Sequence, residues 1–214
     1  MSERLSNTLS VVLVVCAVSM TGLFARREFF PPSVAAQAEV KVRDWRRYAI
    51  AGSLLGPGQA ELRVVEFSDF QCPFCASASS SLRALRARYP GRLTVVYRHF
   101  PLEIHQHAFA AAVASECAGR QGRFEAFHDA LFAHQDSIPA EGWGGFATRA
   151  GVPDGPAFAS CVRDPRLAGV VRRDMAAARE VGVRATPSFV FDGKMVSGAD
   201  AVPQIERWVA ASLK

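Results

Sequence analysis

The sequence predicts an α/β protein in which a helical block interrupts a small mixed sheet. Two short apolar runs, Leu62–Phe67 and Leu93–Tyr97, flank a helical segment that begins beside a pair of cysteines. Helical periodicity then continues from about Ile104 to Val181, a block of roughly 80 residues. A hairpin signal, Asp192-Gly193, follows near the C-terminus. A chain of 214 residues can supply the core of one such domain and an additional N-terminal segment.

The N-terminal segment differs in kind from the rest. Thr8–Ala25 contains no charged residue, and about 18 residues is the lower limit for a membrane span. Since no small-residue cleavage site follows closely, we predict an uncleaved signal anchor over residues 1–25. The alternative is a cleaved signal peptide, which would leave the protein secreted. We interpret residues 26–60 as a tether and N-terminal extension, and residues 61–214 as the domain.

Topology cannot be derived from the flanking charges, because Arg26 and Arg27 directly follow the apolar run. The cysteines give the better argument. Four of the five lie beyond the span, at Cys72, Cys75, Cys117 and Cys161, an even number suited to two pairs. This favours a domain outside the cytoplasm, in the periplasm or at the cell exterior, held by the N-terminal helix.

The net charge of +5 does not indicate a nucleic-acid partner. Most of the basic residues are arginines scattered through helical stretches, as at Arg83, Arg86 and Arg88. A nucleic-acid module would cluster these charges and place aromatic residues among them. We therefore expect no nucleic-acid binding.

The first strand, helix and strand form a βαβ unit. Ala78, Leu82, Leu85 and Tyr89 repeat at helical spacing after the cysteines, and Pro90-Gly91 ends the run. Because the second strand follows after a single helix, the two strands should be parallel.

The helical block and the C-terminal elements follow in order. Asp164 should cap a helix that ends at Gly182. Ser188–Phe191 and Met195–Ser197 are then predicted as paired strands, and Asp200 should cap a last helix.

Cys72 and Cys75 are separated by two residues, which indicates a redox pair, half a zinc site, or coincidence. Zinc requires two further ligands at suitable spacing, and none follow. Cys72 falls where a strand ends and a helix begins, so free N–H groups and the helix dipole should lower the pKa of its thiol. Pro73 suits the first helical turn, and Cys75 lies one turn further on, placed to attack a mixed disulfide on Cys72. We favour the redox pair.

Glu66 is unusual because it lies within an apolar strand, where a charge is costly. One interpretation is a strand-edge carboxylate that meets an arginine. The other is a buried carboxylate with a raised pKa beside the cysteines, which takes the proton of Cys75 as it attacks. We favour the second, since buried carboxylates tend to be functional.

At this point the sequence resembles a known family. EFSDFQCPFC, with Glu66 six residues before Cys72, resembles the DsbA-like branch of the thioredoxin superfamily, and Thr186-Pro187 resembles its cis-proline loop. Two segments resemble the helical insertion of DsbA-like proteins, RHFPLEIHQHAFAAA (Arg98–Ala112) and GRFEAFHDALF (Gly122–Phe132). The resemblance runs from about Leu62 to the C-terminus. It implies a thioredoxin-like fold with an inserted helical subdomain.

The resemblance also implies roles for individual residues. Cys72 would be the exposed nucleophile, Cys75 the resolving cysteine and Glu66 the buried proton carrier. Pro187 would be cis and face the pair, and the backbone of Thr186 would dock an extended substrate peptide. Pro73 and Phe74, which lie between the cysteines, would contact the substrate. For Pro187 there is an alternative interpretation, an ordinary trans-proline at the start of a strand.

Cys117 and Cys161 have two interpretations, buried free thiols or a structural disulfide. Some DsbA-like proteins carry a second disulfide in this subdomain, so the resemblance favours the bond, which adds on the order of 4 kcal/mol in the chain-entropy model. The five histidines are scattered, and we assign none of them to catalysis.

The resemblance implies a protein disulfide oxidoreductase acting on exported cysteine-containing proteins. A quinone-linked membrane thiol oxidase, DsbB-like or VKOR-like, would restore its disulfide, and no metal or organic cofactor is expected. The dipeptide between the cysteines is Pro-Phe, not the Pro-His of strongly oxidising members, which leaves the direction of electron flow open. The alternatives are a disulfide reductase or isomerase, a glutaredoxin-like enzyme, and a tethered Cu(I) metallochaperone.

Overall fold

The computed structural model describes residue 20, residues 39–138, 140–198 and 200–213. The predicted anchor, apart from Met20, and the first part of the predicted tether lie outside the described residues. No described helix has the length and hydropathy required to cross a bilayer. One compact unit spans Ala38–Lys214.

Six strands form one mixed sheet in the order β1-β6-β5-β3-β4-β2. Their bounds are β1 Val40–Lys41, β2 Ser53–Leu55, β3 Leu62–Ser68, β4 Leu93–His99, β5 Ser188–Phe191 and β6 Lys194–Ser197. β3 pairs with β4 in parallel, and the other neighbours are antiparallel. All four strands predicted from the sequence are confirmed. The β5–β6 hairpin turns at Asp192 and Gly193, which both have positive φ (46° and 75°), as its turn type requires.

The sheet begins before residue 61, where the sequence analysis placed the start of the domain. β2 pairs with β4 at one edge, and β1 pairs with β6 at the other. A short helix, α2 (Arg46–Ile50), lies between them in sequence. Strands of two or three residues are too short to show a periodic pattern, so the sequence did not predict them. Tyr48 of α2 is buried, whereas Ile50 at the end of the same helix is 78% exposed.

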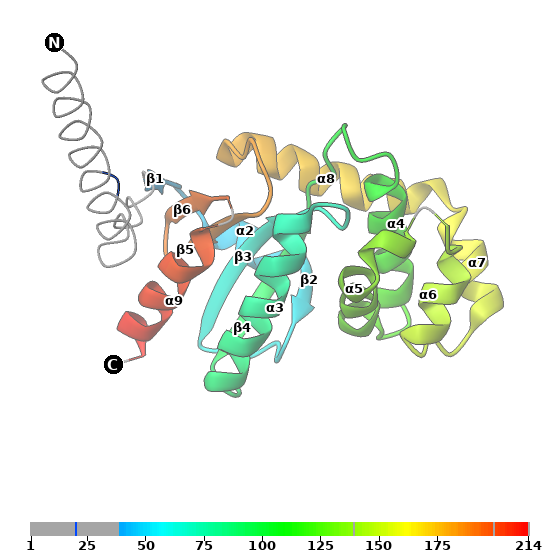
Figure 1. Cartoon of the computed structure of the whole chain (residues 1–214), viewed down its shortest axis with the longest axis horizontal. Coiled ribbons are helices and arrows are strands. Elements are labelled where there is room, and N and C mark those ends of the chain that lie inside the picture. Colours follow the sequence, from blue (N-terminus) through cyan, green and yellow to red (C-terminus); the bar gives the residue numbers. More distant parts are fainter. Residues whose placement is uncertain (1–19, 21–38, 139, 199, 214) are drawn as a thin grey trace, which may run out of the picture. The chain divides into compact units, whose positions relative to one another are not determined.

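Helices cover both faces of the sheet and form the insertion (Figure 1). Their bounds are α3 Pro73–Arg88, α4 Ala108–Gly119, α5 Phe124–Ala133, α6 Trp143–Arg149, α7 Gly155–Val162, α8 Pro165–Val181 and α9 Ala201–Ser212, with a 3-10 turn, η1, at Gln135–Ser137. In Figure 1, α3 and α9 lie in front of the sheet, while α4, α5, α6 and α7 gather beside it. The helical insertion predicted from the sequence is confirmed.

The predicted helix caps have mixed outcomes. The Asp164 carboxylate accepts from the Arg166 N–H at 2.9 Å at the start of α8. Gly182 ends α8 with φ 90°, a conformation that favours glycine. Asp200 precedes α9, but its side chain accepts no capping hydrogen bond, so that prediction was wrong.

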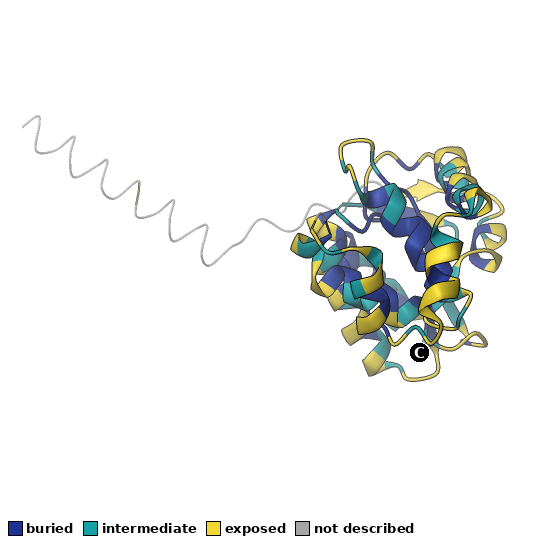
Figure 2. Ribbon diagram, turned by 90° about the vertical axis from the view of Figure 1, so that its right-hand side faces the viewer, coloured by how far each residue is buried: buried dark blue, intermediate teal, exposed yellow. Residues whose placement is uncertain are grey.

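Two apolar clusters hold the layers together, one on each face of the sheet. On the α3 face, Val64 and Val95 pack with Leu82 of α3. On the opposite face, Val65 and Phe67 of β3 pack with neighbours that include Tyr48 of α2 and Ala178 of α8. The helices accordingly turn their buried residues inward and their exposed residues outward (Figure 2).

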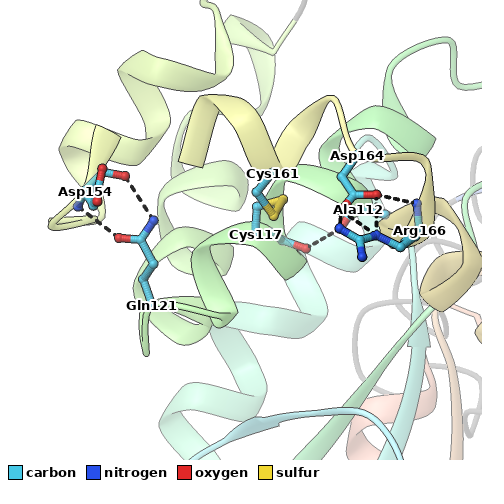
Figure 3. Close-up of a disulfide and its surroundings, with 8 residues drawn as sticks. Ala112, Cys117, Gln121, Asp154, Cys161, Asp164 and Arg166 are labelled. Carbon is cyan, nitrogen blue, oxygen red and sulfur yellow. Dashed lines mark hydrogen bonds and ion pairs between the residues drawn. A yellow bond between two sulfur atoms is a disulfide. The ribbon is translucent and has the colours of Figure 1, made fainter. Parts of the chain in front are cut away.

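A disulfide joins Cys117 of α4 to Cys161 of α7 within the insertion (Figure 3). The two cysteines are 44 residues apart in sequence. Cys117 is 1% exposed. The pairing implied by the family resemblance is the one present in the structure.

Removing this disulfide should weaken the fold without altering the cysteine pair on α3. In the chain-entropy model, a loop of this length adds about 4 kcal/mol, so the double variant Cys117→Ala/Cys161→Ala should lose about 2–4 kcal/mol of unfolding free energy. Urea unfolding of both forms measures the loss. Because the disulfide lies apart from α3, the dithiol-oxidation rate at 20 °C should stay within about twofold of wild type. An unchanged unfolding midpoint would contradict the stabilising role.

Candidate active site

The turn from β3 into α3 places Cys72 at the start of a helix. Cys72 is the N-cap of α3, with extended backbone (φ −77°, ψ 120°), and Pro73 occupies the first helical turn. The Cys72 carbonyl accepts from the N–H groups of Cys75 at 3.1 Å and Ala76 at 3.2 Å. The remaining N–H groups of the first turn and the helix dipole therefore point toward the Cys72 sulfur, which favours the thiolate.

The two cysteines are both free thiols and both are buried. Cys72 is 4% exposed, so the prediction of an exposed nucleophile was wrong, because the Thr186 carbonyl lies against its sulfur. Cys75 is completely buried, and burial followed by the Cys72 side chain raises the pKa of its thiol far above the usual range. The Cys75 thiol in turn is the main cause that lowers the pKa of Cys72 to about 5, with Thr186 and the backbone N–H groups of Cys75 and Phe74 contributing. At neutral pH the pair therefore holds one proton, on Cys75.

The loop before β5 faces Cys72. The Thr186–Pro187 peptide bond is cis, and the Cys72 sulfur lies 3.5 Å from the Thr186 carbonyl oxygen, to which it donates when it is protonated. β5 neighbours β3 in the sheet, with Phe67 opposite Ser188, which brings this loop next to the end of β3. The cis bond and its position are as the family resemblance implied. The Thr186 hydroxyl is buried and has no hydrogen-bond partner in the described part of the chain.

Glu66 lies in the sheet beneath the cysteines and is completely buried. It is flanked by Tyr97 of β4 and Phe189 of β5. Because β3 is an inner strand, the alternative of a strand-edge carboxylate is wrong. Neither carboxylate oxygen has a hydrogen-bond partner among the residues that the structure describes. Burial raises the pKa of Glu66 to about 7, against a smaller opposing effect of Ser68, which is the direction expected for a buried carboxylate.

Glu66, Ser68, Tyr97 and Cys75 form one buried polar group on the α3 face. The charge of Glu66 raises the pKa of Cys75, so the two side chains lie near each other. Ser68 lowers the pKa values of Glu66, Cys75 and Tyr97, although its hydroxyl forms no hydrogen bond within the described chain. Burial raises the pKa of Tyr97 well above its usual range. Ser68 is thus a residue that acts on the pKa of both Glu66 and Cys75.

The sequence analysis missed Asp69, which holds the turn between β3 and Cys72. Its buried carboxylate accepts from the N–H groups of Gln71 (2.7 Å) and Leu102 (2.7 Å) and pairs with Nδ1 of His105 (2.8 Å). An acidic residue directly after a buried strand is a recognisable pattern, but its partners lie more than 30 residues further along the chain. Gln135 was also missed, and no pattern in its own segment points to it.

The remaining predicted residues lie around and away from the sulfurs. Phe74 is 55% exposed, so its ring is available to a bound molecule next to Cys72. Pro73 is also exposed. Cys117 and Cys161 are not brought to this site, since they join α4 and α7 of the insertion. Within the described ranges no three His, Cys, Asp or Glu side chains cluster as metal ligands, and the two thiols of the pair are the groups that would hold a soft ion such as Cu(I).

A cysteine pair at a helix start, a cis-proline loop facing it and a buried carboxylate beneath define a thiol–disulfide oxidoreductase of thioredoxin-like fold. Residues 49–211 match the family model described as "Thioredoxin". The chain belongs to this family, in its DsbA-like branch. The match begins before β3, in agreement with the N-terminal part of the sheet.

Solved structures agree with this assignment. A thioredoxin-like oxidoreductase from Silicibacter pomeroyi DSS-3 is 28% identical, with a TM-score of 0.63 over 75% of this chain and 91% of that one. DsbA2 from Pseudomonas aeruginosa is also 28% identical, with a TM-score of 0.57 over 75% of this chain and 95% of that one.

One relative is an antiporter, and the similarity covers only part of its length. The Na(+)/H(+) antiporter NhaA 3 of Salinispora tropica is 38% identical over 144 residues, which are 67% of this chain and 22% of the antiporter. The chain therefore spans under a quarter of that relative.

Proposed function

We propose that the protein is a dithiol oxidase that transfers the Cys72–Cys75 disulfide to exported cysteine-containing proteins. The observation that carries this proposal is the contrast between the sulfurs, since the pKa of Cys72 is lowered to about 5 while Cys75 is buried with a raised pKa. A low pKa stabilises the reduced protein and makes Cys72 a good leaving group, and both effects favour donation of the disulfide.

The reaction proceeds in two exchanges. A substrate thiolate attacks Cys72 Sγ of the disulfide, the S–S bond to Cys75 breaks, and Cys75 leaves as a thiolate that takes a proton from Glu66. A second substrate thiolate then attacks the substrate sulfur of the mixed disulfide and expels the Cys72 thiolate. The substrate loses two electrons and forms its disulfide, and the cysteine pair gains those two electrons.

Substrate would bind along the loop that faces Cys72. The Thr186 carbonyl lies within reach of the sulfur, and a peptide extended beside it would pair with the backbone there. The exposed Phe74 and Pro73 offer apolar contacts next to the mixed disulfide. Binding of this kind recognises the peptide backbone and a single cysteine, so many unfolded proteins could be substrates, whatever their sequence.

Reoxidation reverses the exchange. Cys72 would attack a disulfide of a quinone-linked membrane thiol oxidase, and Cys75 would then attack Cys72 while Glu66 takes its proton. We place the domain outside the cytoplasm, anchored to the membrane through residues 1–25. The cysteine pair then works where disulfides persist.

Two cysteine variants test the exchange. Cys72→Ser should abolish oxidation of a dithiol peptide. Cys75→Ser cannot form the pair's disulfide either, but its Cys72 thiolate should still attack a peptide disulfide, and the resulting mixed disulfide should accumulate because Cys75 is missing. Non-reducing electrophoresis with mass spectrometry measures both, and Cys117→Ala/Cys161→Ala is the matched control for loss of two sulfurs elsewhere. Wild-type rates in Cys72→Ser would refute the proposal.

The reduction potential decides the direction of flow. A value toward about −120 mV supports the oxidase, and one near about −270 mV indicates a reductase. Stoichiometric Cu(I) binding by the reduced protein with negligible dithiol oxidation would instead indicate a metallochaperone.

A further inference from the structure

The turn that carries Cys72 is held by the helical insertion rather than by the sheet. Residues 69–72 connect β3 to α3, and each forms a contact with the inserted block or its entry loop. Asp69 accepts from Leu102 and His105, and the Gln71 side chain accepts from the His107 N–H at 2.5 Å. These bonds fix the side of the turn that faces the loop before α4.

Gln135 holds the other side of the same turn. Its side-chain Nε2 donates to the Phe70 carbonyl at 2.8 Å and to the Cys72 carbonyl at 2.9 Å. One amide group thus uses both of its hydrogens to join two carbonyls that lie two residues apart. Gln135 begins the 3-10 turn after α5, and Phe132 at the end of α5 packs on the Phe70 ring with centroids 5.1 Å apart. The ring contact explains why this part of the insertion reaches the turn.

We propose that Gln135 is a positioning residue through which the helical insertion sets the geometry of Cys72 and the stability of its thiolate. The Cys72 carbonyl already accepts from two helical N–H groups, and Gln135 adds a third donor. Without it, the Phe70 carbonyl would lose the Gln135 donor and the Cys72 carbonyl would lose one of its three donors, so the partial negative charge near the sulfur would be less compensated. The turn would also be free to move Cys72 away from Thr186.

Substitution of Gln135 by Leu removes the donors and keeps the approximate volume. Losing hydrogen bonds of ordinary strength should raise the pKa of Cys72 by about 0.5–1 unit, so that the ratio of thiolate to thiol at pH 5 falls roughly three- to tenfold. Gln135→Glu should raise the pKa further, because a carboxylate repels both carbonyls and the thiolate. Gln135→Lys should lower it relative to Leu, because an ammonium donates to both carbonyls.

The insertion contains a matched control, Gln121. Its side chain also bridges backbone groups, donating to the Asp154 carbonyl (3.0 Å) and accepting from the Asp154 N–H (2.9 Å), as Figure 3 shows. It lies beside the Cys117–Cys161 disulfide, not beside Cys72. Gln121→Leu therefore removes equivalent bonds from the same subdomain and should leave the pKa of Cys72 unchanged.

The test measures thiolate ultraviolet absorbance against pH for the full-length wild type and the four variants, together with the alkylation rate of Cys72. The proposal is supported if the pKa of Cys72 rises in Gln135→Leu, is higher still in Gln135→Glu and, in Gln135→Lys, is lower than in Gln135→Leu. If Gln135→Leu does not fold, the Glu and Lys variants decide, since a purely structural role predicts shifts of one sign. A pKa in Gln135→Leu equal to that of Gln121→Leu would overturn it.

This inference rests on the proposed function only where it concerns the rate of dithiol oxidation. The experiment can therefore refute the oxidase function and the positioning role of Gln135 independently. A wild-type protein that oxidises no dithiol while Gln135→Leu still shifts the pKa would refute the oxidase and support the positioning role. If wild type oxidises dithiols but the Gln135 variants all keep the wild-type pKa of Cys72, the oxidase function is supported and the positioning role is refuted.

Discussion

Between pH 5 and pH 9 the reduced wild-type protein is expected to gain unfolding free energy relative to a Cys72→Ser variant. The pKa of Cys72 is lowered from an ordinary thiol value of 9.0 to about 5 in the folded protein. The folded state therefore releases this proton before the unfolded state does, and stability rises with pH until the unfolded thiol also ionises. Four pKa units correspond to about 5 kcal/mol, and screening at the active-site rim reduces this to about 2–5 kcal/mol.

The sign follows from a depressed pKa. The stabilisation is fully present above pH 9 and is lost as the pH falls through about 5. Cys72→Ser keeps Glu66 and Cys75, and burial is the largest cause that raises the pKa of Cys75, so the difference between the two proteins is due mainly to the Cys72 thiol. Urea unfolding under reducing conditions at five pH values measures it.

Oxidation provides a second control, because the disulfide form has no thiol to ionise at position 72. Its unfolding free energy should show the pH dependence of the Cys72→Ser variant rather than that of reduced wild type. Parallel pH profiles for reduced wild type and Cys72→Ser would mean that the thiolate is not stabilised. The argument for an oxidase would then lose its energetic basis, since the drive to donate the disulfide comes from the stability of the reduced state.

The sequence predicted those parts of the site that depend on local order along the chain. Cys72 and Cys75 follow a strand and open a helix, and that order alone indicates a thiol at a helix N-terminus. Glu66 was recognisable because a carboxylate interrupts an apolar strand. In both cases the residue and its structural context lie within ten positions of each other.

Residues that act across long sequence separations were not predicted. Gln135 contacts Phe70 and Cys72 over more than 60 positions. Asp69 meets Leu102 and His105 over more than 30. A single sequence carries the polarity of such residues but not their partners, because tertiary packing decides which polar groups meet. β1 and β2 escaped prediction for a related reason, since edge strands this short are defined by the strands beside them.

Replacing Glu66 by Gln should have two separable effects, the first on stability. Burial raises the pKa of Glu66 from 4.5 to about 7, so the folded state holds a proton that the unfolded state loses. The stability associated with that proton is fully present below pH 4.5 and is lost as the pH rises through about 7. Relative to Glu66→Gln, wild type should therefore lose about 3 kcal/mol of unfolding free energy across this window. The matched control is Glu61→Gln, which removes an exposed pair with Arg92 next to the start of the same strand. Because this variant keeps Glu66, its pH profile should match that of wild type.

The second effect concerns proton transfer. Cys75 is buried with a strongly raised pKa, so its attack on a mixed disulfide at Cys72 needs a nearby base, whereas Cys72 is already a thiolate. In the reoxidation half-reaction, Glu66→Gln should therefore slow the attack of Cys75 on the mixed disulfide by about 100-fold, the lower end of general-base effects, and leave the first attack of Cys72 on the oxidant's disulfide within about twofold. Rapid acid quench separates the two steps. If both steps slow equally, Glu66 has a structural role in the site rather than a role in proton transfer. If neither step slows while the expected stability slope is present, Ser68 or solvent is the proton acceptor.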